Sequence, residues 1–456
     1  MQLIVLLMIV SVILANFFVR LDVLPQLAKF LPELLSAVAG LVVVAMGAIQ
    51  RFQFVRLAYW LVFAVIAISV LCGIFANGVE SGPVINGMRV YLRALPFFFL
   101  PAVVRFTDGQ IRRQLWLVFL LALAQVPIAV FQRWVVQSEG RWTGDPVSGT
   151  LEISSILSIF LISTACVLTG LHLRGRISKL AYIALFFLLL FPTMINETKG
   201  TLFLLPPGLL LAFVFGSPPQ KRIRITITAV VMLAGFAAVF FPVYQMMLVN
   251  RPYGVPLTDL FTQQGALEGK LMQSQQLGSY EDRAPPGRLD TVVVPLREIS
   301  HDPVSLVFGL GIGSVRESSA LGPQFTGAYY RRLEYFTFTS LGSFLSELGL
   351  LGTGLVFLLY WLIFQDSLAV ARRDSSTTGA IAVGWCGVVG VVVLGCFYKQ
   401  LEMFESLSYL FWYFSGLVAA SRMRGAARDT EPARVRPSRA SKAAIQSARP
   451  SAIGVK

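Results

Sequence analysis

Charged side chains are scarce in this chain of 456 residues, of which Asp, Glu, Lys and Arg make up only 14%. A soluble globular protein carries roughly 25% charged residues to cover its surface, so this composition excludes a water-soluble globule. Hydrophobic residues make up 55% of the chain. They lie in long blocks that match the roughly 20 residues a helix needs to cross the hydrocarbon core of a bilayer.

Cysteine and histidine are also scarce, with four and two residues. Cys72, Cys166, Cys386 and Cys396 lie in or beside apolar blocks, and their spacing matches no zinc or haem pattern. We expect them to be small core residues, and we expect no metal and no other cofactor. Alternation of apolar and polar residues is missing from blocks such as 183–191, which excludes the strands of a membrane β-barrel.

The apolar blocks predict an all-α, polytopic helical membrane protein with about 12 transmembrane helices. The first block lacks a basic flank and a signal cleavage site, so we expect it to remain as the first span. The predicted spans are 2–19, 33–49, 57–76, 90–104, 114–131, 151–171, 180–195, 201–216, 225–243, 341–364, 377–396 and 407–420.

Basic residues in the short connections predict the orientation, because cytoplasmic loops are enriched in Lys and Arg. This pattern places both termini in the cytoplasm. The connections after the even-numbered spans contain Arg51, Arg56, Arg105, Arg112, Arg113, Arg174, Arg176, Lys179, Lys221, Arg222, Arg224, Arg372 and Arg373. The predicted domains are a membrane domain of nine spans (1–243), a large external loop (244–340), three further spans (341–420) and a disordered basic cytoplasmic tail (421–456).

The external loop is the place where we expect chemistry, because a loop of that length in a compact protein is usually functional. Leu289, Val292, Val293, Leu296 and Ile299 recur at helical spacing, which predicts an amphipathic helix lying at the membrane interface or packed within the loop.

The segment after this pattern has glycine at every second residue, at Gly309, Gly311 and Gly313. This spacing predicts a tight turn or a close approach of the backbone to a ligand. Neither a Walker loop nor a Rossmann fingerprint fits this segment.

Three local patterns together resemble the O-antigen polymerase and ligase superfamily of bacterial envelope glycosyltransferases. The first is a small-basic-glycine tripeptide between two spans, Thr198-Lys199-Gly200. The second is Arg288 followed by Pro303 and the three alternating glycines. The third is Glu-x-Gly-x-x-Gly at the re-entry into the membrane, with Glu347, Gly349 and Gly352.

The resemblance implies a metal-independent membrane glycosyltransferase in the bacterial inner membrane, with the large loop on the periplasmic or extracellular side. Its substrate would be a polyprenyl-diphosphate-linked oligosaccharide, polymerised into a cell-surface polysaccharide such as O-antigen, capsule or exopolysaccharide. Membrane lipid and other polysaccharide-assembly proteins are the expected partners, and no nucleic acid is expected.

Positive side chains would bind the lipid diphosphate and stabilise its departure. The expected binding residues are Lys199, Arg288, Arg331, Arg332, Arg89 and Arg93. The acceptor needs a base, and four residues remain open for that role: Glu197, His301, Glu334 and Glu347.

Three other interpretations stay open, one of which is a noncatalytic scaffold whose loop binds a partner. Ligases of the superfamily carry a His-Asn pair where this chain has Phe338 and Thr339, which favours a polymerase over transfer to another acceptor. A polysaccharide or lipid transporter (flippase) would show charges in mid-span and internal repeats, and neither is visible in the sequence.

Overall fold

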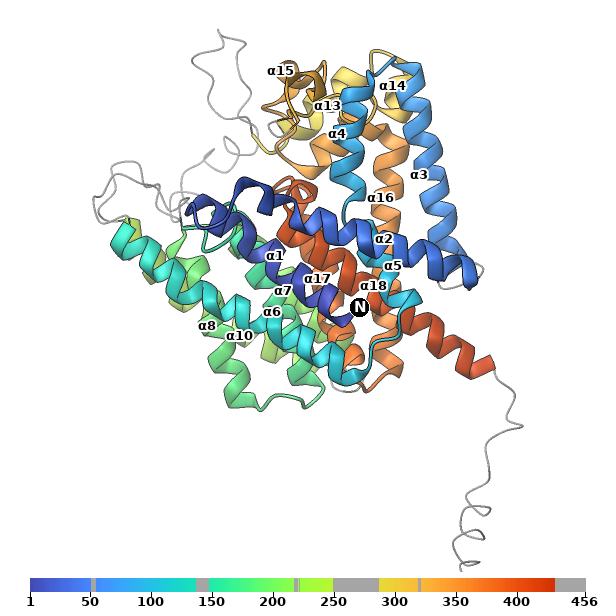
Figure 1. Ribbon diagram of the computed structural model, residues 1–456. Helices are drawn as coiled ribbons and strands as arrows, with labels where there is room; N and C mark the ends of the chain where they lie inside the picture. Colours follow the sequence, from blue (N-terminus) through green and yellow to red (C-terminus); the bar gives the residue numbers. More distant parts are fainter. Residues whose placement is uncertain are drawn as a thin grey trace, which may run out of the picture.

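The protein is described by a computed structural model that covers residues 1–50, 55–136, 147–216, 220, 222–248, 287–318 and 321–430. Within these residues the regular structure is helical and no strand occurs (Figure 1). Arg51, Lys221, residues 249–286 of the predicted loop and residues 431–456 of the predicted tail lie outside the described residues.

The helices follow one another as α1 (Gln2–Arg20), α2 (Leu31–Ile49), α3 (Leu57–Ala76), α4 (Ser81–Leu92), α5 (Leu95–Val103), α6 (Asp108–Phe131), α7 (Ser154–Leu173), α8 (Lys179–Ile195), α9 (Gly200–Gly216), α10 (Arg222–Leu248), α13 (Asp290–Ile299), α14 (Pro303–Phe308), α15 (Tyr330–Leu333), α16 (Ser340–Arg373), α17 (Thr377–Gly395) and α18 (Glu405–Thr430). Short turns of other helix types lie at η1 (Gln26–Phe30), η2 (Gln132–Val136), η4 (Pro323–Phe325) and η5 (Leu401–Met403).

Eight helices in the described part of the chain are long and apolar enough to cross a membrane, and two shorter apolar helices, α8 and α9, accompany them. The protein is therefore an all-α polytopic membrane protein, and the count of twelve spans stays a prediction. One boundary is wrong: the span expected over 90–104 is two helices, α4 and α5, separated at Arg93 and Ala94. The chain breaks there because Pro96, in the first turn of α5, lacks the N–H that a continuous helix would need.

The centre of the bundle is α17, which packs on α7, α9 and α16. Small residues permit this: a Cβ added to Gly384 would lie 2.5 Å from the Cys166 carbonyl oxygen, and one added to Gly170 would lie 2.2 Å from the Ala380 oxygen. Helices in lipid associate through such close backbone contacts. Cys166, like Cys386 and Cys396, is a buried free thiol, as the sequence predicted.

Asp366 joins three helices at one end of the bundle. Its carboxylate lies 2.5 Å from Arg56 and 2.5 Å from Arg422, and it accepts a hydrogen bond of 2.8 Å from the Tyr59 hydroxyl. Arg174 donates to the carbonyl of Ala371 nearby in the chain. Several basic connections predicted to be cytoplasmic therefore meet at this end.

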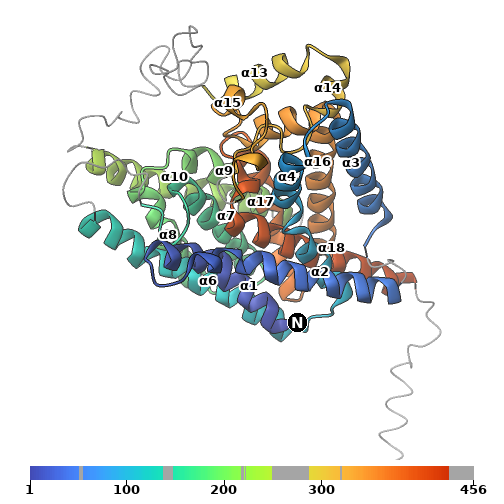
Figure 2. The ribbon, with the colours of Figure 1, turned by 45° about the horizontal axis from the view of Figure 1, so that its top comes forward.

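A cap of short helices covers the opposite end of α3, α4 and α16 (Figures 1 and 2). It comprises α13, α14 and α15, and it has a small core of its own made by Ile299, Leu310, Val315 and Leu333. The predicted amphipathic helix is confirmed as α13, with Ile299 buried and Leu289, Val293 and Leu296 exposed.

The predicted tail is wrong at its start, because α18 continues through Thr430, beyond the expected boundary at residue 421. Arg422 contacts Asp366, and Arg424 donates a hydrogen bond of 3.0 Å to the Pro101 carbonyl, so the first residues of this extension are held against the bundle.

Candidate functional site

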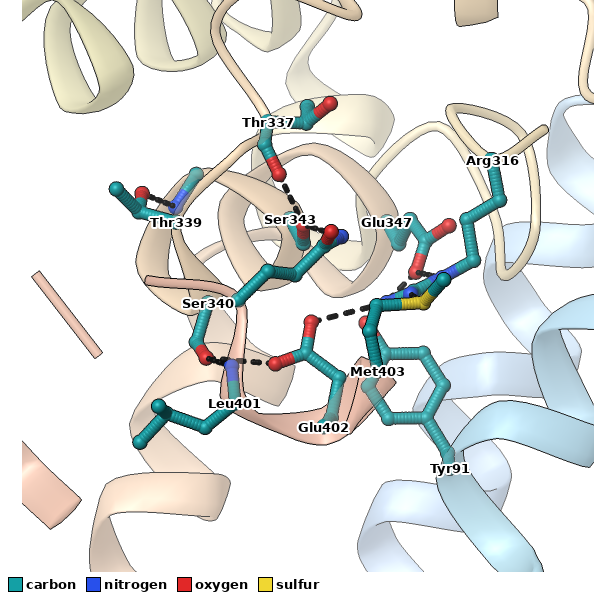
Figure 3. Close-up of polar contacts among 12 residues, drawn as sticks. Tyr91, Arg316, Thr337, Thr339, Ser340, Ser343, Glu347, Leu401, Glu402 and Met403 are labelled. Atoms are coloured by element: carbon teal, nitrogen blue, oxygen red, sulfur yellow. Dashed lines mark hydrogen bonds and ion pairs between the residues drawn. The ribbon is translucent and has the colours of Figure 1, made fainter. Parts of the chain in front are cut away.

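Glu347 lies in the first part of α16 and is completely buried. Its Oε2 lies 2.9 Å from Arg316 Nε and accepts a hydrogen bond of 2.6 Å from the Tyr91 hydroxyl (Figure 3). Its Oε1 accepts a hydrogen bond of 3.1 Å from the Gly313 amide. A buried charge is tolerated when it is paired in this way. Glu347 therefore holds the cap on the membrane helix and is not placed as a free base.

Arg316 is 3% exposed and bridges Glu347 to a second carboxylate, Glu402 (Figure 3). Its Nη2 lies 3.1 Å from Glu402 Oε1, and the other Glu402 oxygen accepts a hydrogen bond of 2.6 Å from Ser340. Burial by itself lowers the pKa of the Arg316 guanidinium, but the charges of Glu347, Tyr91 and Glu402 outweigh it and raise that pKa. Arg316 is a permanent cation that joins three chain segments.

The alternating glycines form a turn that lies directly on α16. Gly309, Gly311 and Gly313 all have positive φ values, of 77°, 93° and 80°, which glycine adopts without strain. A Cβ at Gly313 would lie 1.8 Å from the Pro83 oxygen, and one at Gly309 would lie 2.4 Å from the Glu347 carbonyl carbon. The prediction of a tight turn is confirmed, and the close approach is to protein backbone.

Arg288, just before α13, contacts two aromatic rings. Its guanidinium carbon is 4.6 Å from the centre of the Phe338 ring and 5.0 Å from that of Tyr398, and its Nη1 donates a hydrogen bond of 2.6 Å to the Tyr398 carbonyl. Burial lowers the pKa of Arg288, yet a guanidinium stays charged at physiological pH. We call these three residues the Arg288 clamp.

The turn that holds Lys199 packs against the same clamp. A Cβ added to Gly200, at the start of α9, would lie 2.5 Å from the Tyr398 ring, so only glycine lets the turn approach so closely. Lys199 is half-buried in this turn. The first and second sequence patterns therefore meet at Tyr398.

Glu197 stands next to this turn in an unusual backbone conformation, with φ of 60°. Its Oε1 lies 2.7 Å from Arg133 Nη2, and both side chains are largely buried. The pair fixes the turn, and this carboxylate is already engaged by a cation.

Arg89 and Arg93 lie at the break between α4 and α5. Arg89 Nε donates to both oxygens of Glu33, at 2.9 and 3.0 Å. Arg93 Nη1 lies 3.0 Å from Glu405, and its Nη2 donates to the Met403 carbonyl at 2.5 Å. Arg93 thus reaches the connection 396–404 between α17 and α18, next to the Arg288 clamp.

The remaining predicted residues lie on the outside of the cap. His301 and Arg331 are exposed, and Arg332 pairs with Glu298 at 2.8 Å while its side chain stays 65% exposed. Glu334 follows α15 and is only partly buried. Within the described residues, none of the four makes a hydrogen bond or ion pair with the connection 396–404. The structure therefore does not bring these four residues to the connection 396–404.

Sequence reasoning missed Arg316, Tyr91 and Glu402. Their signal in the sequence is weak, because they lie in three separate segments. A charged residue in a short connection between two apolar helices, as Glu402 is, marks a position where a buried partner can be sought.

The fold and the site define a polytopic helical membrane protein whose cap, α16 and the connection 396–404 join around a set of buried charges. No family model matches the chain, and no curated protein matches it.

Proposed function

We propose that this protein is a metal-independent glycosyltransferase of the bacterial plasma membrane that polymerises polyprenyl-diphosphate-linked oligosaccharide repeat units into a cell-surface polysaccharide. The observation that supports it is the convergence of three separate sequence patterns. The tripeptide 198–200 and Arg288 meet at Tyr398, and the glycine turn meets Glu347.

Arg288 and Lys199 are the residues that would bind the diphosphate. Cations near the leaving oxygens stabilise the negative charge that develops as the sugar–phosphate bond breaks. The Arg288 guanidinium is restrained by two rings and one carbonyl, so little of its conformational freedom remains to be lost on binding. Such preorganisation favours a site for a charged headgroup.

A lipid-linked substrate also has an apolar part. An apolar cavity of about 130 Å³ lies among α7, α16, α17 and α18, with Phe160, Phe344 and Trp385 in its walls. Tyr91 and Glu402 also line it, so the cavity begins at the buried charge network. This arrangement supports a ligand with one polar and one apolar end.

The proposal is tested in cells that carry the full chain as their only copy. Arg288→Ala and Lys199→Ala are compared with Arg331→Ala, which removes an exposed cation from the same cap. With equal amounts of protein in the membrane, the first two variants should lose long glycans and accumulate single repeat units on the lipid carrier. Unchanged glycan lengths in both would overturn the proposal.

The same experiment separates the two other functions. If the protein is a ligase, the same variants would accumulate long chains on the carrier. If it is a transporter, they would leave repeat units on the cytoplasmic face. Phe338 and Thr339 have structural roles here: Phe338 stacks on Arg288, and Thr339 accepts a hydrogen bond of 3.1 Å from the Gly342 amide at the start of α16. The two positions at which ligases carry a His-Asn pair thus serve packing and capping, which favours the polymerase.

A further inference from the structure

A second cavity, of about 350 Å³, lies beside the Arg288 clamp. Its walls come from five separate chain segments: α1, the break between α4 and α5, the residues before α7, the connection before α16, and the connection leading into α18. The lining includes Asn16, Arg93, Glu152, Phe338, Gln400 and Glu405. We call it the Glu152 cavity.

Two of the residues that line this cavity each have a buried polar atom without a hydrogen-bond partner among the described residues. Glu152 Oε1 accepts a hydrogen bond of 3.2 Å from Asn16, but Glu152 Oε2 is buried and has no hydrogen-bond partner in the described part of the chain. The Arg93 side chain is 8% exposed, and its Nε is likewise buried without a partner there. Buried groups of this kind carry a free-energy cost unless something binds them.

The missing partners are an acceptor for Arg93 and a donor for Glu152. A hydroxyl group is both a donor and an acceptor, so a hydroxyl-rich molecule suits a cavity lined by the carboxylate of Glu152 and the guanidinium of Arg93. Carboxylates, amides and a guanidinium around an aromatic ring therefore suit a sugar. Phe338 belongs to both sites, since it stacks on Arg288 and lines the cavity, so a sugar in the cavity would adjoin a diphosphate at the clamp.

We propose that the Glu152 cavity holds the acceptor sugar and that Glu152 is the catalytic base of the transfer. This assignment rests on the glycosyltransferase function proposed above and names its second substrate site. It replaces the bases expected from the sequence, because Glu197 and Glu347 are paired with arginines and His301 lies on the outside of the cap.

The step balances without a co-reactant. The acceptor hydroxyl oxygen forms a bond to the anomeric carbon of the donor, and the bond from that carbon to the diphosphate oxygen breaks. Its electron pair stays on the diphosphate beside Arg288 and Lys199. The hydroxyl proton passes to the Glu152 carboxylate and then to solvent.

The surroundings of Glu152 suit a base. Burial raises the pKa of its carboxyl; its backbone amide, the hydrogen bond from Asn16 and the charges of Arg20 and Arg93 offset part of that rise. Lys399 and Glu405 are the other charged groups lining the cavity. A base acts in its deprotonated form, so activity should be present above this raised pKa and lost as the pH falls through it.

The test uses membranes containing the full chain and lipid-linked repeat units extracted from cells that lack it. Glu152→Gln keeps the shape of the side chain, and we expect polymer formation at least ~100-fold slower, the usual contribution of a general base. Glu80→Gln, which changes an exposed carboxylate between α3 and α4, should keep the parental rate. Repeat units should still co-purify with Glu152→Gln but much less with Arg288→Ala.

Two further measurements distinguish the loss of a base from a loss of activity caused by a disturbed structure. Glu152→Asp keeps a carboxylate and should give an intermediate rate that still falls at low pH, whereas the residual rate of Glu152→Gln should not follow that fall. A parental rate for Glu152→Gln, or an unaltered pH profile, would overturn the assignment of the base. If parental membranes make no polymer from the same repeat units, the proposed function itself is wrong.

Discussion

The Arg288 guanidinium stacks on the Phe338 ring, with 4.6 Å from its carbon to the ring centre. The two residues come from opposite ends of the cap, and the centre of the Tyr398 ring lies 5.0 Å from the same guanidinium carbon. The cation is thus held in place by groups that do not neutralise its charge.

We expect Arg288→Lys to bind the lipid-linked donor about tenfold or more weakly, although the charge is kept. An ammonium group lacks the planar surface that stacks on two rings and cannot make bidentate bonds to phosphate. The measurement is the amount of repeat unit that co-purifies with each variant. Equal amounts with Arg288→Lys and the parental protein would show that the stacking is irrelevant to binding.

Breaking the buried ion pair should destabilise the whole protein. Arg316→Ala leaves Glu347 buried without its cation, a change that typically costs about 3–5 kcal/mol. Thermal unfolding in detergent would detect it. The control is Arg332→Ala. The ion pair of Arg332 with Glu298 involves an exposed arginine, and such a pair stabilises the fold by about 0–1 kcal/mol.

Gly313→Ala should destabilise the folded protein more than the addition of one methyl group usually does. The residue has a positive φ, and the added carbon would collide with the Pro83 carbonyl. We therefore expect the free energy of unfolding to fall by about 1–3 kcal/mol. Gly354→Ala in α16 is the matched control, since nothing lies within 4 Å of the added carbon. Alanine there favours the helix by about 1 kcal/mol. Comparable unfolding temperatures for the two variants would contradict the described turn.

Cysteine labelling tests the orientation. His301→Cys on the cap should react with a membrane-impermeant maleimide in intact spheroplasts, whereas Arg113→Cys in α6 should react only after the membrane is opened. Both side chains are exposed, so access depends on the side of the membrane alone. The reverse pattern would place the cap inside the cell and remove the proposed substrate from its reach.

Sequence patterns predicted the features that depend on local composition. The membrane class follows from hydropathy, and α13 follows from the spacing of Leu289, Val293 and Leu296. The break at Arg93 was missed because the apolar residues continue through it, while the decisive features are Pro96 and the partner Glu405.

The charge network could not be predicted from the sequence. Arg316, Glu347 and Glu402 are neighbours only because the glycine turn folds onto α16 and the connection 396–404 lies beside it. Glu152 lines a cavity whose other walls come from segments distant in the chain. Long-range contacts of this kind leave no period in the sequence.

The interruption of α16 at Gly349 has a mechanical consequence. At this point the helix leaves its regular path, with φ of 64°, and the Leu310 amide of the cap donates a hydrogen bond of 2.7 Å to the Ser346 carbonyl in the preceding turn. The Ser346 carbonyl of the helix thus accepts a hydrogen bond from the backbone amide of a residue outside the helix. The cap is consequently joined through the backbone to the part of α16 that precedes the kink at Gly349.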